Sequence, residues 1–335
     1  MILLAEKHTL KFIKPAKTSR GSYVEKEVLL LVLENKNARY TAEVAPLSDL
    51  SVDGKIDLMS IIEPFLGKEY NHQSLIELLE YCNPYPSLRF GVCSLIKKLE
   101  KQSEIWTQSP FTKKETPMEI NGLVWMNDIE SMAIEAEEKV NQGFRCIKFK
   151  VGALDFDSEC RMLEVFRKKH ASSKIEIRLD ANGAFPDDLA KSMIKDLCRF
   201  EIHSIEQPIK TGNFDQMGML CKEASIDIAL DEELIGVELT KGKSLLKQIQ
   251  PQYLILKPTL IGGFDFCDHW IRLAQEFSIG WWSTSALEGN IGLFDIAQWV
   301  SSYSPRLPQG LGTGSLFVEN FPAKTKVENG YLFCL

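Results

Sequence analysis

Five short segments decide the fold of this 335-residue chain, and each closes an apolar run with a charged residue. They are 146–150 (CIKFK), 177–182 (IRLDAN), 204–208 (SIEQP), 228–233 (IALDEE) and 254–258 (LILKP). Positions 150, 180, 206, 231 and 257 follow one another at intervals of 25 to 30 residues. That interval matches a strand, a loop and a helix of ordinary length. Since the carboxyl ends of the strands in a parallel barrel face one pocket, the spacing predicts that these charges share a site.

From residue 120 onward, strand patterns and helix patterns alternate. Strand candidates at 120–125, 279–285 and 307–311 join the five segments and bring the count to eight, as in a closed barrel. Amphipathic stretches predict helices at 129–142, 156–170, 187–199, 214–223, 238–248, 264–277 and 293–302. No helix pattern follows the eighth strand. Residues 116–314 are therefore expected to form an α/β domain, a (β/α)7β modified TIM barrel that carries the active site.

Residues 1–115 read differently, because strands come first and helices follow. Three strands are predicted at 8–13, 27–33 and 39–44, and three helices at 58–65, 73–81 and 87–101. This order suggests a small α+β domain, joined to the barrel by a polar linker at 106–117. A turn signal at 327–331 predicts a hairpin in the tail, residues 315–335, which is expected to return to this N-terminal domain.

The composition excludes several classes of protein. The formal net charge of −7 and the absence of a basic stripe argue against a nucleic-acid partner. No run approaches the roughly 20 apolar residues that a membrane span needs. The eight cysteines are scattered, with no Cys-x-x-Cys pair, so reduced thiols in a cytoplasmic protein are expected. The sequence carries no signal for an oligomeric state.

Lys148 and Lys150 are the first candidate catalytic groups. Alternation along a strand places both side chains on one face. Mutual repulsion and burial would each lower the pKa of a lysine toward neutrality, as a general base requires. Two solvated surface lysines are the competing interpretation. It is weakened because Ile147, Phe149 and Val151 would then fill the barrel interior.

Asp180, Glu206 and Asp231 are three carboxylates at the ends of three successive strands. Each alone could be a surface acid or a helix cap, but three in register predict a site for Mg²⁺, with Mn²⁺ as an alternative. Lys257 ends the sixth strand, across the barrel from Lys150. An aldolase that forms a Schiff base would also place a lysine at a strand end, but it would not need the three carboxylates.

Taken together, Lys-x-Lys, Asp-x-Asn, Glu-Gln-Pro, Asp-Glu and Lys-Pro resemble the enolase superfamily, and within it the muconate-lactonizing subgroup. The resemblance covers nearly the whole chain and implies that residues 1–115, with the tail at 315–335, form a capping domain over the barrel. The mandelate racemase subgroup would carry a histidine on a later strand, and none of the five histidines fits. Phe185 stands where the family often has tryptophan, and Glu233 where it often has serine.

The resemblance implies a lyase that removes a proton α to a carboxylate and then eliminates water, with Mg²⁺ stabilising an enediolate. Lys150 would be the base, Lys148 its partner, and Lys257 the group on the opposite face. Glu232 is expected behind Lys257. Further candidates for contact with a small carboxylate substrate are Arg178, Asn182, Ser283, Ser285 and Gly312.

Three alternatives stay open at this point. A racemase of N-acylamino acids, or another epimerase or cycloisomerase of the subgroup, would use the same lysines. Dipeptide epimerases carry an Asp-x-Asp on the last strand, whereas this chain has Gly310-Leu311-Gly312-Thr313-Gly314. A non-catalytic barrel is the remote alternative. Loops of the capping domain at 15–23 and 45–52 are expected to select the substrate.

Overall fold

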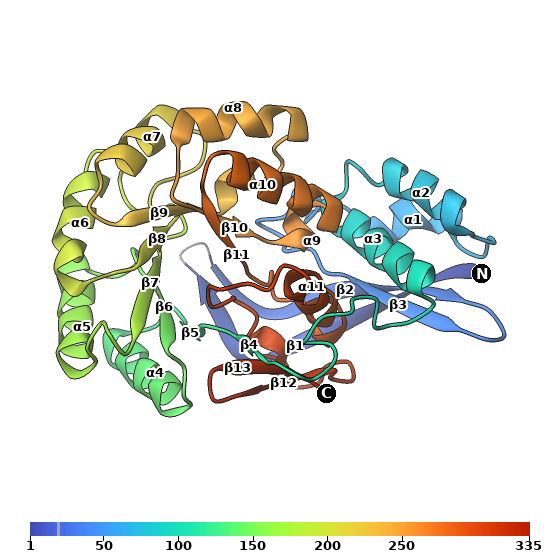
Figure 1. The fold of residues 1–335 in the computed structure, drawn as a ribbon, viewed down its shortest axis with the longest axis horizontal. Coiled ribbons are helices and arrows are strands. Elements are labelled where there is room, and N and C mark those ends of the chain that lie inside the picture. Colours follow the sequence, from blue (N-terminus) through green and yellow to red (C-terminus); the bar gives the residue numbers. More distant parts are fainter. Residues whose placement is uncertain (19–20) are drawn as a thin grey trace.

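The computed structural model describes residues 1–18 and 21–335 and contains a curled sheet of seven parallel strands, ordered β11-β10-β9-β8-β7-β6-β5 (Figure 1). The strands are β5 (Gly122–Val124), β6 (Cys146–Lys150), β7 (Glu176–Asp180), β8 (Ser204–Glu206), β9 (Asp227–Leu230), β10 (Tyr253–Leu256) and β11 (Gly280–Ser283). The predicted eighth strand is reduced to two bridges, in which Gln309 pairs with Ile120 and Gly310 pairs with Thr284. These bridges connect the two edges of the sheet, so the modified TIM barrel is confirmed.

Helices cover the outside of the barrel (Figure 1). They are α4 (Ile129–Asn141), α5 (Phe156–Lys169), α6 (Ala190–Leu197), α7 (Phe214–Glu223), α8 (Leu239–Ile249), α10 (Phe264–Glu276) and α11 (Asn290–Ser301). A short helix that the sequence did not predict, α9 (Pro258–Ile261), begins directly after Lys257, with proline at its first position. The 3₁₀ turns are η1 (Glu63–Phe65), η2 (Cys198–Phe200), η3 (Glu232–Leu234) and η4 (Thr313–Ser315).

Strand β6 shows how the sequence produces the layers of the barrel. All five of its residues are buried. Phe149 points outward, where its ring meets Phe166 of α5 at a centroid distance of 5.2 Å. Strand alternation then directs Lys148 and Lys150 to the other face, into the barrel. The surface interpretation of the two lysines is therefore wrong.

The capping domain is an antiparallel sheet, β1-β2-β3, with three helices. Its elements are β1 (Ile2–Thr18), β2 (Gly21–Glu34), β3 (Arg39–Val44), α1 (Leu58–Ile62), α2 (His72–Tyr81) and α3 (Pro86–Lys101). The first two strands are longer than the predicted 8–13 and 27–33. Their outer ends are mostly exposed, so apolar alternation fades there. A register shift between Lys11 and Ala16 accommodates Pro15, which has no N–H for the ladder.

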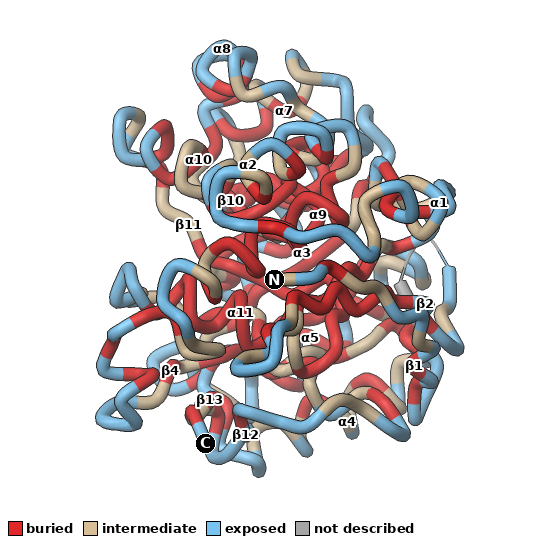
Figure 2. Tube along the Cα trace, turned by 90° about the vertical axis from the view of Figure 1, so that its right-hand side faces the viewer, coloured by how far each residue is buried: buried red, intermediate tan, exposed pale blue. Residues whose placement is uncertain are grey.

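The segment predicted as a polar linker, 106–117, packs closely against the barrel. Trp106 is buried, and its backbone N–H donates to Gln298 Oε1 at 2.8 Å. Its indole N–H donates to Asp295 of the same helix, α11, at 3.3 Å. Figure 2 shows the buried stretches of α3, α9 and α11 meeting in the interior. The capping domain and the barrel thus share a continuous packed boundary.

The C-terminal tail contacts both parts of the molecule. Phe317 pairs with Phe12 of β1, and the N–H of Ile13 donates to the carbonyl of Leu316. The predicted hairpin forms from β12 (Thr325–Glu328) and β13 (Tyr331–Cys334), but it pairs with β4 (Met118–Glu119), just before the first barrel strand. The expectation that the whole tail returns to the capping domain is therefore wrong for the hairpin.

Two further observations concern the described residues, 1–18 and 21–335. None of their helices has the length and apolar character needed to cross a membrane. The eight cysteines are all free thiols, and seven of them are buried.

Candidate active site

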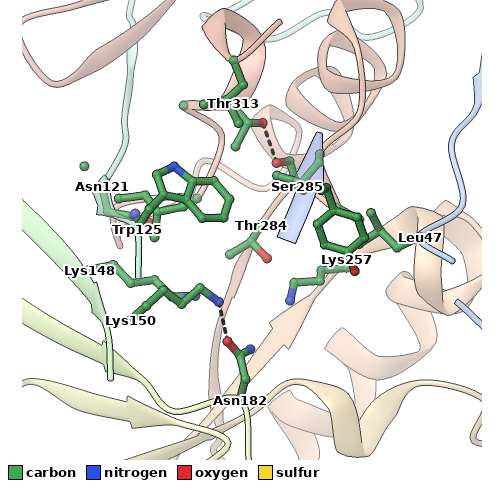
Figure 3. A pocket seen from close by; sticks show the side chains of 18 of the residues that line it. Leu47, Asn121, Trp125, Lys148, Lys150, Asn182, Lys257, Thr284, Ser285 and Thr313 are labelled. Carbon is green, nitrogen blue, oxygen red and sulfur yellow. Dashed lines mark hydrogen bonds between the residues drawn. The ribbon is translucent and has the colours of Figure 1, made fainter. Parts of the chain in front are cut away.

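A pocket lies at the mouth of the barrel, beneath the capping domain. Lys148 and Lys150 enter it from β6, and Lys257 enters from the opposite side, after β10. Figure 3 shows the ammonium groups of these lysines directed toward a shared space. The capping domain closes the pocket with Leu47 and Leu50, which belong to the loop at 45–52 that the sequence predicted.

The three predicted metal ligands lie beneath the lysines and pair with them. Lys148 Nζ lies 2.7 Å from Asp180 Oδ2 and 2.6 Å from Glu206 Oε2. Lys150 Nζ donates to Asp180 Oδ2 at 2.6 Å. Lys257 forms an ion pair with Asp231. The parallel register explains this arrangement, because Lys150, Asp180 and Glu206 are direct neighbours across β6, β7 and β8.

The electrostatics of these pairs correct one expectation. Burial lowers the pKa of Lys148, but the charges of Asp180 and Glu206 outweigh burial and hold that pKa above its ordinary value. The same holds for Lys257, whose pKa is raised mainly by Asp231. Burial and repulsion between the lysines would lower this pKa, but the two carboxylates outweigh both effects, so the predicted lowering is wrong for Lys148.

The carboxylates respond to their environment in two directions. Burial would raise the pKa of Asp180, but Lys148, Lys150 and Lys257 hold it well below its usual range. The pKa of Glu206 is raised, first by burial and then by the charge of Asp180. The pKa of Asp231 is also raised by burial. The neighbouring lysines therefore do not fully offset the burial of Glu206 and Asp231, and an additional cation would stabilise their charged forms.

The donor set fits a divalent cation. Glu206 Oε1 and Asp231 Oδ1 are buried and have no hydrogen-bond partner. Such oxygens are costly to bury unless a cation or a donor meets them. Within the described part of the chain, no three acidic, histidine or cysteine side chains could hold an ion as they stand. The lysines pair with one oxygen of each carboxylate, Asp180 Oδ2, Glu206 Oε2 and Asp231 Oδ2, so a bound cation would compete with these ion pairs.

Asn182 and Glu232 connect the two sides of the pocket. Asn182 Oδ1 accepts from Lys150 Nζ at 2.8 Å, and Asn182 Nδ2 donates to Glu232 Oε1 at 3.0 Å. Glu232 also contributes to the raised pKa of Lys257. Both residues line the pocket. Glu232 is therefore near enough to Lys257 to influence its pKa.

Two of the other candidates do not line the pocket. Arg178 is buried within the barrel, where it donates to Glu176 and to the carbonyl of Pro308, both at 2.8 Å, and stacks on Trp282. Ser283 directs its hydroxyl to the carbonyl of Leu256 at 2.8 Å. Their expected contact with substrate is corrected, because the alternating face reaches the pocket only at the strand ends. Ser285 and Gly312 do line it.

Among the pocket residues that were not predicted from the sequence are Trp125, Thr284 and Thr313. Thr313 Oγ1 lies 2.6 Å from Ser285 Oγ, and Trp125 and Thr284 face the same space as the lysines (Figure 3). Trp125 and Thr284 directly follow β5 and β11, so the strand-end rule could have found them. They carry no charge, and the search for charged residues passed over them.

Comparison with known proteins assigns the class. The family model "Enolase C-terminal domain-like" matches residues 131–333, more than half of the chain. This chain belongs to the enolase superfamily. Together with its relatives, this membership identifies it as an enzyme of the lyase kind.

Individual relatives show which members of the superfamily this chain resembles. The chain is 36% identical to the o-succinylbenzoate synthase of Desulfotalea psychrophila, over 99% of this chain and 98% of the relative. The crystal structure of MenC from that organism matches with a TM-score of 0.85 and 34% identity, over 99% of both chains. Muconate lactonizing enzyme from Pseudomonas fluorescens shares the fold, with a TM-score of 0.83 over 99% of this chain and 92% of that one, at 17% identity.

Proposed function

We propose that the chain is an o-succinylbenzoate synthase. It would dehydrate 2-succinyl-6-hydroxy-2,4-cyclohexadiene-1-carboxylate to 2-succinylbenzoate, a step of menaquinone biosynthesis. The observation that carries the proposal is the placement of Lys150 and Lys257 on opposite sides of one pocket, over three buried carboxylates. The full-length similarity to a named o-succinylbenzoate synthase supports the choice of reaction.

Lys150 performs the proton transfers in this proposal. Its neutral amine takes the proton from the carbon that bears the ring carboxylate, and the C–H electron pair moves into an enediolate. The resulting ammonium then donates the same proton to the hydroxyl on the neighbouring carbon as that C–O bond breaks. Water leaves, the ring becomes aromatic, and Lys150 returns to its starting state. One lysine can serve both steps because the proton and the hydroxyl group leave from the same face of the ring.

Lys148 and Lys257 act as electrostatic partners. Lys148 lies on the same strand face as Lys150 and would help to neutralise the substrate carboxylate. Lys257 would stabilise the anion from the opposite face. Asp180, Glu206 and Asp231 would hold Mg²⁺, with Mn²⁺ as an alternative. When bound, the ion supplies positive charge to the carboxylate oxygens as the α-proton leaves.

Replacement of Lys150 by alanine tests the proposal. We expect K150A to reduce dehydration by at least about 10³-fold, because the acid and the base are lost together. Formation of the aromatic product, followed by ultraviolet absorption, measures the rate. Lys241→Ala, at an exposed lysine of α8, is the matched control and should keep wild-type activity. EDTA should stop the wild-type reaction and Mg²⁺ restore it. Substantial turnover by K150A would overturn the assignment.

Racemisation of N-acylamino acids is the second candidate, and the opposed lysines favour it too. A racemase would use Lys150 and Lys257 as acid and base on the two faces of one carbon. Exchange of the α-proton in D₂O from both enantiomers of an N-succinylamino acid would reveal that chemistry. The pocket residues from 284 to 316 include no acid, which supports a dehydratase over a dipeptide epimerase. The absence of both turnover and Mg²⁺ binding would favour a non-catalytic barrel.

The expected partner is a small carboxylate with no nucleic acid or membrane involved, and we place the protein in the cytoplasm. The floor of the pocket, formed by Lys148, Lys150 and Lys257, provides positive charge that attracts the carboxylate. Trp125, Leu47 and Leu50 provide an apolar wall for a ring. The free thiols are consistent with a reducing compartment.

A further inference from the structure

A buried lysine of the capping domain forms hydrogen bonds with a loop of the barrel. Lys26 belongs to β2, and its side chain is almost fully buried. Its Nζ donates to the carbonyl oxygen of Ala286 at 2.6 Å and to that of Leu287 at 3.0 Å. Both acceptors follow strand β11, far away in the sequence. The proposed mechanism makes no use of this lysine.

The loop to which Lys26 donates, residues 285–287, forms part of the pocket wall. Ser285, Ala286 and Leu287 all line the pocket. Leu287 has a φ of +59°, a conformation that a branched side chain adopts only when its surroundings hold it there. The two hydrogen bonds from Lys26 reach the backbone on either side of this constraint. The lysine therefore secures the segment where its conformation is least favourable.

Two buried acids complete the arrangement. Glu288 accepts from Ala286 N at 2.8 Å and from Thr259 Oγ1 at 2.5 Å. Glu43, on β3 of the capping domain, accepts from Gly289 N at 2.6 Å and Gly292 N at 2.9 Å, at the start of α11. Both carboxylates raise the pKa of Lys26, although burial lowers it to about 8. Burying three ionisable groups is costly, so their placement serves more than packing.

We propose that Lys26 is a positioning residue that fixes the pocket wall at 285–287 and thereby sets the affinity for substrate. It acts through the two carbonyl groups and touches no reacting atom. The inference rests on the proposed function, because it concerns the wall of that same pocket. Its consequence is that a residue of the capping sheet controls substrate binding without lining the pocket.

Replacement of Lys26 by methionine tests this role. We expect K26M to raise KM about tenfold while kcat stays within about twofold, because binding is impaired and the lysines of the floor are untouched. Lys98→Met is the matched control. Lys98 is a buried lysine of α3 that pairs with Asp295 of α11 at 2.9 Å, and it does not line the pocket. K98M should lower the melting temperature and leave KM unchanged.

A second readout separates this inference from the proposed function. Calorimetric binding of 2-succinylbenzoate should weaken about tenfold in K26M, whether or not the wild type turns substrate over. An inactive wild type would refute the function, whereas wild-type affinity in K26M would refute the role of Lys26 alone. If K26M does not fold, Thr259→Val provides a second test, because it replaces the hydroxyl that donates to Glu288 with a methyl group of similar size. It should raise KM about two- to threefold, and an unchanged KM would overturn the proposal.

Discussion

At the residue scale, Asn182 combines an unusual backbone conformation with a side-chain bridge across the pocket. Its φ of +45° lies in the left-handed region, where asparagine is tolerated better than most residues. In that conformation, its amide bridges Lys150 and Glu232. The sequence indicated Asn182 only through the family motif, since neither the turn nor the bridge can be read from residue types.

Two substitutions separate these two roles of Asn182. Asn182→Gly keeps the left-handed backbone accessible and removes the amide, so we expect kcat to fall about tenfold with little change in stability. Asn182→Ala should show the same loss of kcat and an additional loss of about 1 kcal/mol in the free energy of unfolding. Steady-state kinetics and urea unfolding measure the two effects. Equal stability of the two variants would contradict the backbone argument.

At the element scale, barrel strands could be predicted and capping strands only in part. Strands β6 to β8 end at charged residues, and β9 and β10 are directly followed by them, so parallel pairing brings these charges together. The long outer ends of β1 and β2 had no such signal, because they are exposed and lack strong alternation. The fold of the barrel was therefore predicted well, and the length of the capping hairpin was not.

Helix α5 holds the loop that follows Lys150. Glu159 accepts from Gly152 N at 2.8 and 3.0 Å through its two oxygens, and from Leu154 N at 3.2 Å. We expect Glu159→Ala to lower the free energy of unfolding by about 2–3 kcal/mol, since buried N–H groups lose their acceptor. Glu164→Ala, on the exposed face of the same helix, should cost under about 0.5 kcal/mol. Urea denaturation compares the two, and equal losses would contradict this account.

At the scale of the whole molecule, the contacts between the capping domain and the barrel were invisible in the sequence. Trp106 lay in a segment that appears polar, and Lys26 lay in a strand with no marked motif. Each finds its partner roughly 190 to 260 residues away, and no local pattern encodes such a pairing. The floor of the site could be predicted from charge and spacing. Its walls depend on these long-range contacts, so they could not.

The same boundary predicts how stability depends on pH. Burial raises the pKa of Glu43 to about 7, with Lys26 and Glu288 facing it. The folded state then keeps a proton that the unfolded chain releases near pH 4.5. The protonated Glu43 therefore contributes to the free energy of unfolding; this contribution is fully present below pH 4.5 and is lost as the pH rises through 7. For 2.5 pKa units (7 − 4.5) it amounts to about 3 kcal/mol at most.

Unfolding in urea at pH 5 and pH 7.5 measures this dependence. Burial also raises the pKa of Glu159 to about 7 and that of Asp295 to about 6, so the wild type should lose stability between these two pH values. Glu43→Gln removes one of the titrating groups and should lose less stability over the same interval. Identical losses in the two proteins would show that Glu43 does not titrate in this range.

The pairing of Phe317 with Phe12 has a consequence for folding during synthesis on the ribosome. Residue 12 of strand β1 is translated 305 residues (317 − 12) before its neighbour at 317, and Leu316 also lines the pocket. At 5–20 residues per second, about 15 seconds or more separate the two. During that interval the edge of β1 is unprotected and the pocket lacks a wall. The pocket of a nascent chain therefore stays incomplete until residues 316–318 have left the exit tunnel.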